Sequence, residues 1–170
     1  VHLSTVFEWC ADTGTNRFVT NDRDDFVSTS IRHVDTVVNV GNGTYTCTQQ
    51  GTVLVQSAAG LTITCLDVLY MPKCGKKLMP ATPFVRKCCT LTLYDNSKIR
   101  RMSANKTVLL EGKNIDGLYY FECETLRRDA IDSSLKSYDS QSSTINTESA
   151  EFHSNVKTFQ VVNDNSTVYY

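Results

Sequence analysis

The residues best suited to chemistry are Asp12, Thr13 and Gly14, which directly follow the mostly apolar residues 6–11. A carboxylate that leaves a buried strand beside a turn permitted by glycine is held rigidly at the edge of a core. There, desolvation and hydrogen bonds shift its pKa. We therefore expect Asp12 to act as an acid or base in catalysis, or, on the simpler interpretation, to cap a turn.

A hairpin is predicted downstream of this turn, because residues 31–40 and 44–48 are rich in β-branched side chains and are separated by Gly41, Asn42 and Gly43. An Asn-Gly pair between two such runs is a strong hairpin signal, since the turn needs positive φ. From the local pattern alone, this hairpin is equally consistent with an ordinary surface element and with a mobile lid over a site.

The remaining pattern predicts an all-β domain with one short helix at residues 81–87. Alternating apolar positions indicate a second hairpin, and further short strands follow it. The expected strands lie at residues 51–55, 61–70, 91–94, 98–100, 108–110 and 118–121.

The order and spacing of several motifs carry a resemblance to a known family. They are Trp9 three residues before Asp12, and then the segments 38–43, 51–53, 67–72 and 117–120. Over about residues 5–123 the chain resembles the protease region of Ty1/copia-type retrotransposon Gag-Pol polyproteins, within the retropepsin-like aspartic protease family. The resemblance implies a closed β-barrel with a flap hairpin and one short helix. It favours the flap interpretation of the hairpin.

The resemblance also implies a reaction, the hydrolysis of peptide bonds in the Gag-Pol precursor. Aspartic proteases use two carboxylates that share one proton, whereas this chain has a single Asp-Thr-Gly. Asp116 lacks the hydroxyl residue after it. We therefore expect a symmetric homodimer in which Asp12 is contributed by each copy.

By the same resemblance, each residue of the loop and flap has an expected role. Thr13 would brace the two loops across the dimer axis, and Gly14 would let the backbone approach the shared water. Substrate would be bound by Thr15 and Asn16 on the loop and by the flap residues Gly41, Asn42 and Gly43.

Pro80 departs from the family, which has a small residue in this place under the catalytic turn. Proline is bulkier and has no N–H to donate. Two alternatives therefore stand beside the protease: an inactive module of the same fold that dimerises or binds peptides, and an unrelated β-rich binding domain.

Composition limits the partners that we expect. The 170 residues have a formal charge of −1 and a pI near 6.3, which argues against a domain whose main task is to bind nucleic acid. Basic residues between 73 and 101 predict a solvated face, or an acidic partner or RNA as the alternative. We expect no metal, no cofactor and no membrane span.

Domain boundaries and location follow from the same composition. We expect a protease domain at residues 1–123 and a flexible polar tail at residues 124–170, with a strand or a cleavage junction at residues 159–162. The seven cysteines lack zinc-ligand spacing and predict free thiols in a reducing compartment. We expect a cytoplasmic protein, in a virus-like particle by resemblance.

Overall fold

The strand that leads to Asp12 lies in the middle of the sheet. In the computed structural model, β1 (Trp9–Asp12) pairs in parallel with β6 (Lys77–Pro80) on one side and antiparallel with β10 (Leu118–Phe121) on the other. The structure describes residues 6–40, 43–85, 87, 89–94, 96–102, 105–127 and 158–162.

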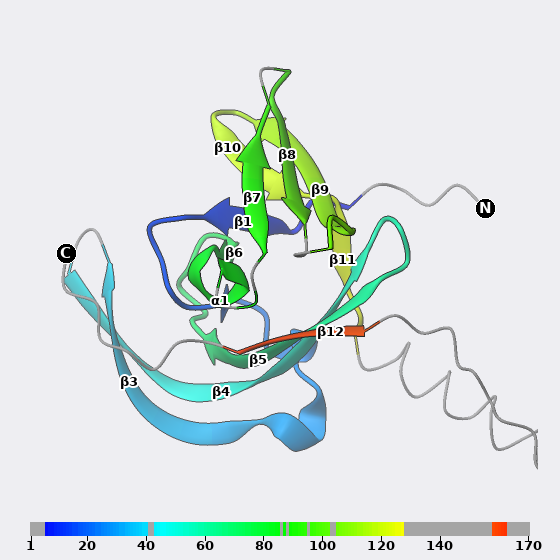
Figure 1. The fold of residues 1–170 in the computed structure, drawn as a ribbon. Helices are drawn as coiled ribbons and strands as arrows, with labels where there is room; N and C mark the ends of the chain where they lie inside the picture. Colours follow the sequence, from blue (N-terminus) through cyan, green and yellow to red (C-terminus); the bar gives the residue numbers. More distant parts are fainter. Residues whose placement is uncertain are drawn as a thin grey trace, which may run out of the picture.

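Two long hairpins form the lower half of the molecule in Figure 1. β3 (Arg32–Val40) pairs with β4 (Gly43–Ser57), and β4 pairs with β5 (Thr62–Tyr70). β2 (Val19–Thr20) joins β5 to β6. Two short 3₁₀ helices, η1 (Arg23–Asp25) and η2 (Ser28–Ser30), lie between β2 and β3. The two hairpins expected from the sequence are confirmed, with β4 continuous through both.

An antiparallel meander forms the upper half (Figure 1). It consists of β7 (Thr90–Leu93), β8 (Lys98–Met102), β9 (Val108–Ile115) and β10. The β9–β10 turn has positive φ at both Asp116 and Gly117, as a two-residue primed turn requires. Asp116 is therefore a turn residue of the hairpin whose second strand, β10, lies beside β1.

The remaining elements are one short helix and two strands from the C-terminal part of the chain. α1 (Thr82–Val85) follows β6 and confirms the predicted helix. β11 (Cys123–Thr125) pairs with β4, and β12 (Thr158–Val162) pairs in parallel with β5. Of the two alternatives predicted for residues 159–162, the strand is present, and the cleavage junction stays a prediction. No described helix is long and apolar enough to cross a membrane.

The all-β class is confirmed, but the expected closure of the barrel is not seen. The strand order runs from β11 at one end to β7 at the other. Among the described residues β11 and β7 do not pair with each other. β11 pairs with β4, and β7 pairs with β8.

The main hydrophobic core lies between the two halves and surrounds β1. Trp9, Phe84 and Phe121 are fully buried there, together with apolar side chains of β4 and β5. Burial of an aromatic or aliphatic side chain contributes about 1.5–3 kcal/mol, so this core fixes the end of β1 in place.

Candidate active site

Asp12 is the last residue of β1, and the turn after it leaves the core. Its Cα partner in the parallel pairing is Pro80. Trp9 and Cys10 of β1 are buried, Asp12 is half-buried, and Thr13 and Gly14 are exposed. A rigid strand therefore presents one carboxylate to a surface that another molecule can reach.

Glycine at position 14 orients this carboxylate. The Gly14 N–H donates a hydrogen bond of 2.8 Å to Asp12 Oδ1. A Cβ at position 14 would lie 3.2 Å from the same oxygen. A larger residue would therefore push the acceptor away from the bond that orients it.

The next two residues continue the loop. The Arg17 N–H donates to Thr15 Oγ1 at 3.1 Å, and the same hydroxyl donates to the Arg17 carbonyl at 3.4 Å. Thr15 and Asn16 are half-buried. The structure thus places the predicted residues 12–16 in one loop, half of it exposed and half anchored.

A buried arginine supports the strand beneath this turn. Arg101 of β8 is fully buried and donates to the carbonyls of Pro80 and Ala81, each at 3.5 Å. Its guanidinium lies 3.9 Å from the ring centroid of Phe84 and 5.4 Å from that of Phe121. Burial lowers the pKa of Arg101 to about 10. Its Nε has no hydrogen-bond partner among the described residues.

A second buried cation lies on β6, two residues before Met79. Lys77 donates to the fully buried carboxylate of Asp25 at 2.9 Å and to Glu8 Oε2 at 3.1 Å. Thr125 Oγ1 donates to the same Glu8 oxygen at 2.7 Å and accepts from Trp9 Nε1 at 3.1 Å. The cluster ties β1, η1, β6 and β11 together.

Two carboxylates of this cluster have shifted pKa values. Burial raises the pKa of Asp25 above its usual range, and the bonds from Thr20 and Lys77 only partly offset this. Burial also acts to raise the pKa of Glu8, but the bonds from Thr125 and the charge of Lys77 lower it overall. The prediction that the basic residues between 73 and 101 form a solvated face is wrong for Lys77 and Arg101, because both side chains are buried.

The β3–β4 hairpin packs against the strands that hold Asp12. Val34 and Val38 of β3 and Tyr45 and Cys47 of β4 form a second apolar cluster. Its other members come from β2, from β5 with the loop after it, and from β6: Val19, Leu69, Met71, Cys74 and Leu78. Since Leu78 pairs with Cys10 of β1, this cluster joins the hairpin to the Asp12 strand.

The tip of the hairpin is only partly described. Val40 and Gly43 are opposite one another and exposed, and Gly43 has a φ of +133°. Gly41 and Asn42 lie outside the described residues, so their expected place over the substrate stays a prediction.

Asp67 of β5 anchors the base of the hairpin. It has a φ of +56°, accepts from Gln50 Nε2 at 3.1 Å and forms an ion pair with Arg32 at the start of β3. The register of β4 and β5 shifts between Gly51 and Val53, near this residue. The Asp67 side chain therefore links both strands of the hairpin to β5, β3 through Arg32 and β4 through Gln50.

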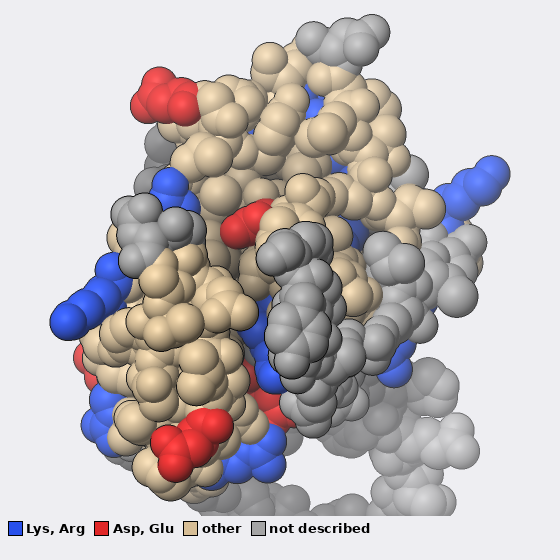
Figure 2. Space-filling view, turned by 90° about the vertical axis from the view of Figure 1, so that its left-hand side faces the viewer, with Lys and Arg blue, Asp and Glu red and all other residues tan. Residues whose placement is uncertain are grey.

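The surface on this side of the molecule is mostly uncharged. Figure 2 shows the side on which the hairpin tip and the loop after β1 lie in Figure 1, and its described charged side chains are scattered. Such a surface suits contact with a protein chain better than contact with a phosphate backbone. Among the described residues there is no cluster of His, Cys, Asp or Glu that would hold a metal ion.

Similarity to known proteins covers the strand, hairpin and helix that form this site. Residues 9–89 match the model of a protein family described as Pol polyprotein, beta-barrel domain. This similarity supports a region of a retroelement Pol polyprotein. No curated protein matches the chain.

Proposed function

We propose that this retroelement Pol polyprotein region is an aspartic endopeptidase, that it acts as a homodimer, and that it cleaves peptide bonds of its own Gag-Pol precursor. The observation that carries the proposal is the geometry of Asp12. Its carboxylate is half-buried at the end of a central strand, is oriented by the Gly14 N–H and borders an exposed turn. We propose in addition that the β-barrel has the fold of the retropepsin-like aspartic proteases.

Hydrolysis needs a second carboxylate close to the first. Two adjacent carboxylates cannot both ionise easily, so they share one proton. The ionised Asp12 takes a proton from a water molecule, whose oxygen attacks the scissile carbonyl carbon. The protonated Asp12 of the other copy donates its proton to the carbonyl oxygen. When the tetrahedral intermediate collapses, a proton passes to the leaving nitrogen and the C–N bond breaks.

The exposed turn suits the contact between two copies. Thr13 and Gly14 project beyond the core, so a second copy can approach Asp12 without displacing buried side chains. A two-fold axis at this turn would bring the same residues together from both copies. Thr13 would then brace the opposite loop through its hydroxyl.

The β3–β4 hairpin supplies an apolar surface for an extended peptide. Val40 of β3 is 43% exposed, although it is a large hydrophobic residue, and strand alternation places it on the same face as Val34 and Val38. A peptide that lies as an added strand between this hairpin and the loop of Thr15 and Asn16 would bury this side chain. We assign substrate contact to these residues and to Gly43.

The test is cleavage of a longer precursor that contains this chain. Asp12→Asn should abolish the cleavage products, because an amide cannot exchange the shared proton. Asp116→Asn is the matched control, since Asp116 lies in an exposed turn with positive φ, which asparagine tolerates. Cleavage that survives in Asp12→Asn would refute the proposal, provided that no other protease is present.

A dimerisation or peptide-binding module without activity is the second candidate. The observation that favours it is Pro80, which is buried opposite Asp12 with the guanidinium of Arg101 at its carbonyl, in place of a small residue. A stable dimer in solution that leaves the precursor intact would select this candidate over the protease.

A further inference from the structure

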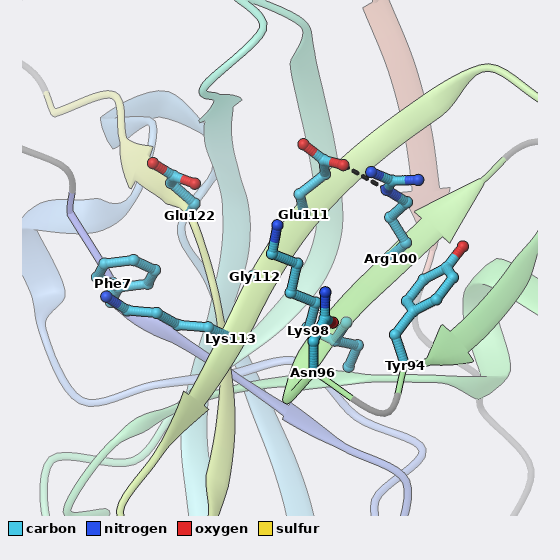
Figure 3. A pocket seen from close by; sticks show the side chains of 10 residues that line it. Phe7, Tyr94, Asn96, Lys98, Arg100, Glu111, Gly112, Lys113 and Glu122 are labelled. Carbon is cyan, nitrogen blue, oxygen red and sulfur yellow. Dashed lines mark hydrogen bonds and ion pairs between the residues drawn. The ribbon is translucent and has the colours of Figure 1, made fainter.

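A pocket on the upper meander lies apart from the Asp12 turn and is not used by the proposed reaction. It has a volume of about 370 Å³, within the range of roughly 300–1,000 Å³ that small-molecule sites occupy. β8, β9 and the β7–β8 turn supply most of its lining, and Phe7 and Glu122 complete it. Figure 3 shows the side chains that line it.

Two lysines face the same pocket from neighbouring strands. Lys98 of β8 and Lys113 of β9 are direct Cα partners in the antiparallel ladder, and both are exposed. Like charges that are directly opposite in a sheet repel one another. In the part of the chain that the structure describes, neither lysine has a carboxylate partner, whereas Arg100 of the next cross-strand pair is bonded to Glu111. An anion between the lysines would remove the repulsion.

Aromatic rings flank the lysine pair on both sides (Figure 3). Lys113 Nζ lies 4.6 Å from the ring centroid of Phe7, and the Arg100 guanidinium lies 5.4 Å from that of Tyr94. The Tyr94 side is open to solvent, since this residue is 37% exposed. Cations beside exposed aromatic rings are the combination with which proteins hold nucleotides, through phosphates and stacked bases.

We propose that this pocket binds one nucleotide unit, with a phosphate between Lys98 and Lys113 and a base stacked on Tyr94. Glu111 and Glu122 also line the pocket. Their oxygens can accept hydrogen bonds from the amino groups of a base, a contact that the carboxylate side chains of an acidic peptide cannot supply. The lining thus favours a nucleotide over an acidic peptide.

This site does not conflict with the low overall charge of the chain. A formal charge of −1 opposes a long polyanion track, whereas one phosphate needs only the local pair of lysines. For a single strand, one neutralised phosphate predicts a slope of about −0.7 for the logarithm of affinity against the logarithm of salt concentration. We expect a slope no steeper than this.

The experiment measures binding of the full 170-residue chain by fluorescence anisotropy. The probe is a labelled single-stranded RNA of about eight nucleotides in about 50 mM salt. Lys98→Ala combined with Lys113→Ala should weaken binding about tenfold or more, while Lys73→Ala combined with Lys87→Ala should change it less than about twofold. The control pair removes the same charge from exposed positions outside the pocket.

Tyr94 separates stacking from charge. Tyr94→Ala should weaken binding about tenfold, and Tyr94→Phe, which keeps the ring, should bind as the parent does. Competition with unlabelled AMP distinguishes a free nucleotide from a strand as the source of the unit. Displacement by AMP at the affinity of the RNA assigns the site to a free nucleotide, and much weaker displacement assigns it to single-stranded nucleic acid.

Several results would overturn the inference. They are no RNA binding by the parent chain, an equal loss in the two double variants, and an octaglutamate peptide that binds as tightly as RNA. The melting temperature of each variant shows whether it is folded. A lowered melting temperature in the Lys98→Ala, Lys113→Ala variant alone would count against repulsion between the two lysines.

Discussion

Lys77 donates a hydrogen bond of 2.9 Å to the carboxylate of Asp25, and both side chains are almost or fully buried. Two charges that are buried as a pair lose more hydration free energy than a pair at the surface, and removal of one partner leaves the other charge without compensation. Lys77 also bonds to Glu8, just before β1. The cluster therefore stabilises the strand pair that positions Asp12.

Lys77→Ala should lower the free energy of unfolding by about 3 kcal/mol, because Asp25 and Glu8 lose their buried cation and keep only the half-exposed Arg127, at 3.6 and 4.0 Å. Urea denaturation at neutral pH measures this loss. Lys73→Ala removes the same charge from an exposed position, and it should cost less than about 0.5 kcal/mol. Equal losses would show that Lys77 contributes no more than a surface charge.

The loss in Lys77→Ala should depend on pH. Burial raises the pKa of Asp25, so this group binds a proton more readily in the folded state and its contribution to stability falls as pH rises through that range. Without Lys77, both carboxylates of the cluster become harder to ionise in the folded chain. The difference in the free energy of unfolding between the parent and Lys77→Ala should therefore grow from about pH 4 to about pH 7. Urea denaturation of both chains at several pH values in this range shows whether the difference grows or shrinks as pH rises.

Arg101→Met should leave stability within about 1 kcal/mol of the parent, because a buried guanidinium with an unpartnered Nε carries a desolvation cost that methionine avoids. Arg101→Ala should cost about 2–4 kcal/mol through the cavity beside Phe84. Urea denaturation compares the two variants. If both are equally unstable, the bonds to the carbonyls of Pro80 and Ala81 outweigh the desolvation cost.

The sequence predicted the hairpins well because their signals are local. β-branched runs on both sides of Asn42-Gly43 need no distant partner to be recognised, and β3 and β4 lie there. The Asp12 turn was also predicted, since an apolar run that stops at Asp-Thr-Gly is visible in a short window.

The roles of Lys77 and Arg101 were not predicted, because they depend on pairings between residues far apart in the chain. Glu8 and Asp25 bind Lys77 from two separate segments, and Thr125 of a third segment bonds to Glu8. Arg101 is buried only because β8 passes beneath Pro80. In the sequence alone, both residues are grouped with the other basic residues between 73 and 101, and nothing in that pattern distinguishes a buried cation from a solvated one. The pairing of β12 with β5 likewise depends on residues nearly a hundred positions apart.

Asp67→Ala should destabilise the chain by about 1–2 kcal/mol, because alanine at a φ of +56° is strained and leaves Arg32 and Gln50 without their acceptor. Asp67→Asn tolerates this φ and keeps one side-chain oxygen, so it should cost less than about 1 kcal/mol. Amide hydrogen exchange should quicken in β3 for the alanine variant. Unchanged exchange would show that Asp67 does not hold the base of the hairpin.

Gly112→Ala should be the most damaging of these substitutions. A Cβ at position 112 would lie 2.0 Å from the carbonyl oxygen of Tyr120 and 2.9 Å from Cα of Phe121. Because these are backbone atoms, β9 and β10 would have to separate, and β10 is the antiparallel neighbour of β1. We expect a loss of about 3 kcal/mol or more in thermal or urea unfolding, with loss of precursor cleavage as the position of Asp12 becomes less defined. Gly75→Ala is the matched control, because a Cβ there meets no atom within 4 Å. A Gly112→Ala chain as stable as Gly75→Ala would show that the β9–β10 pair can shift without disturbing the strand that holds Asp12.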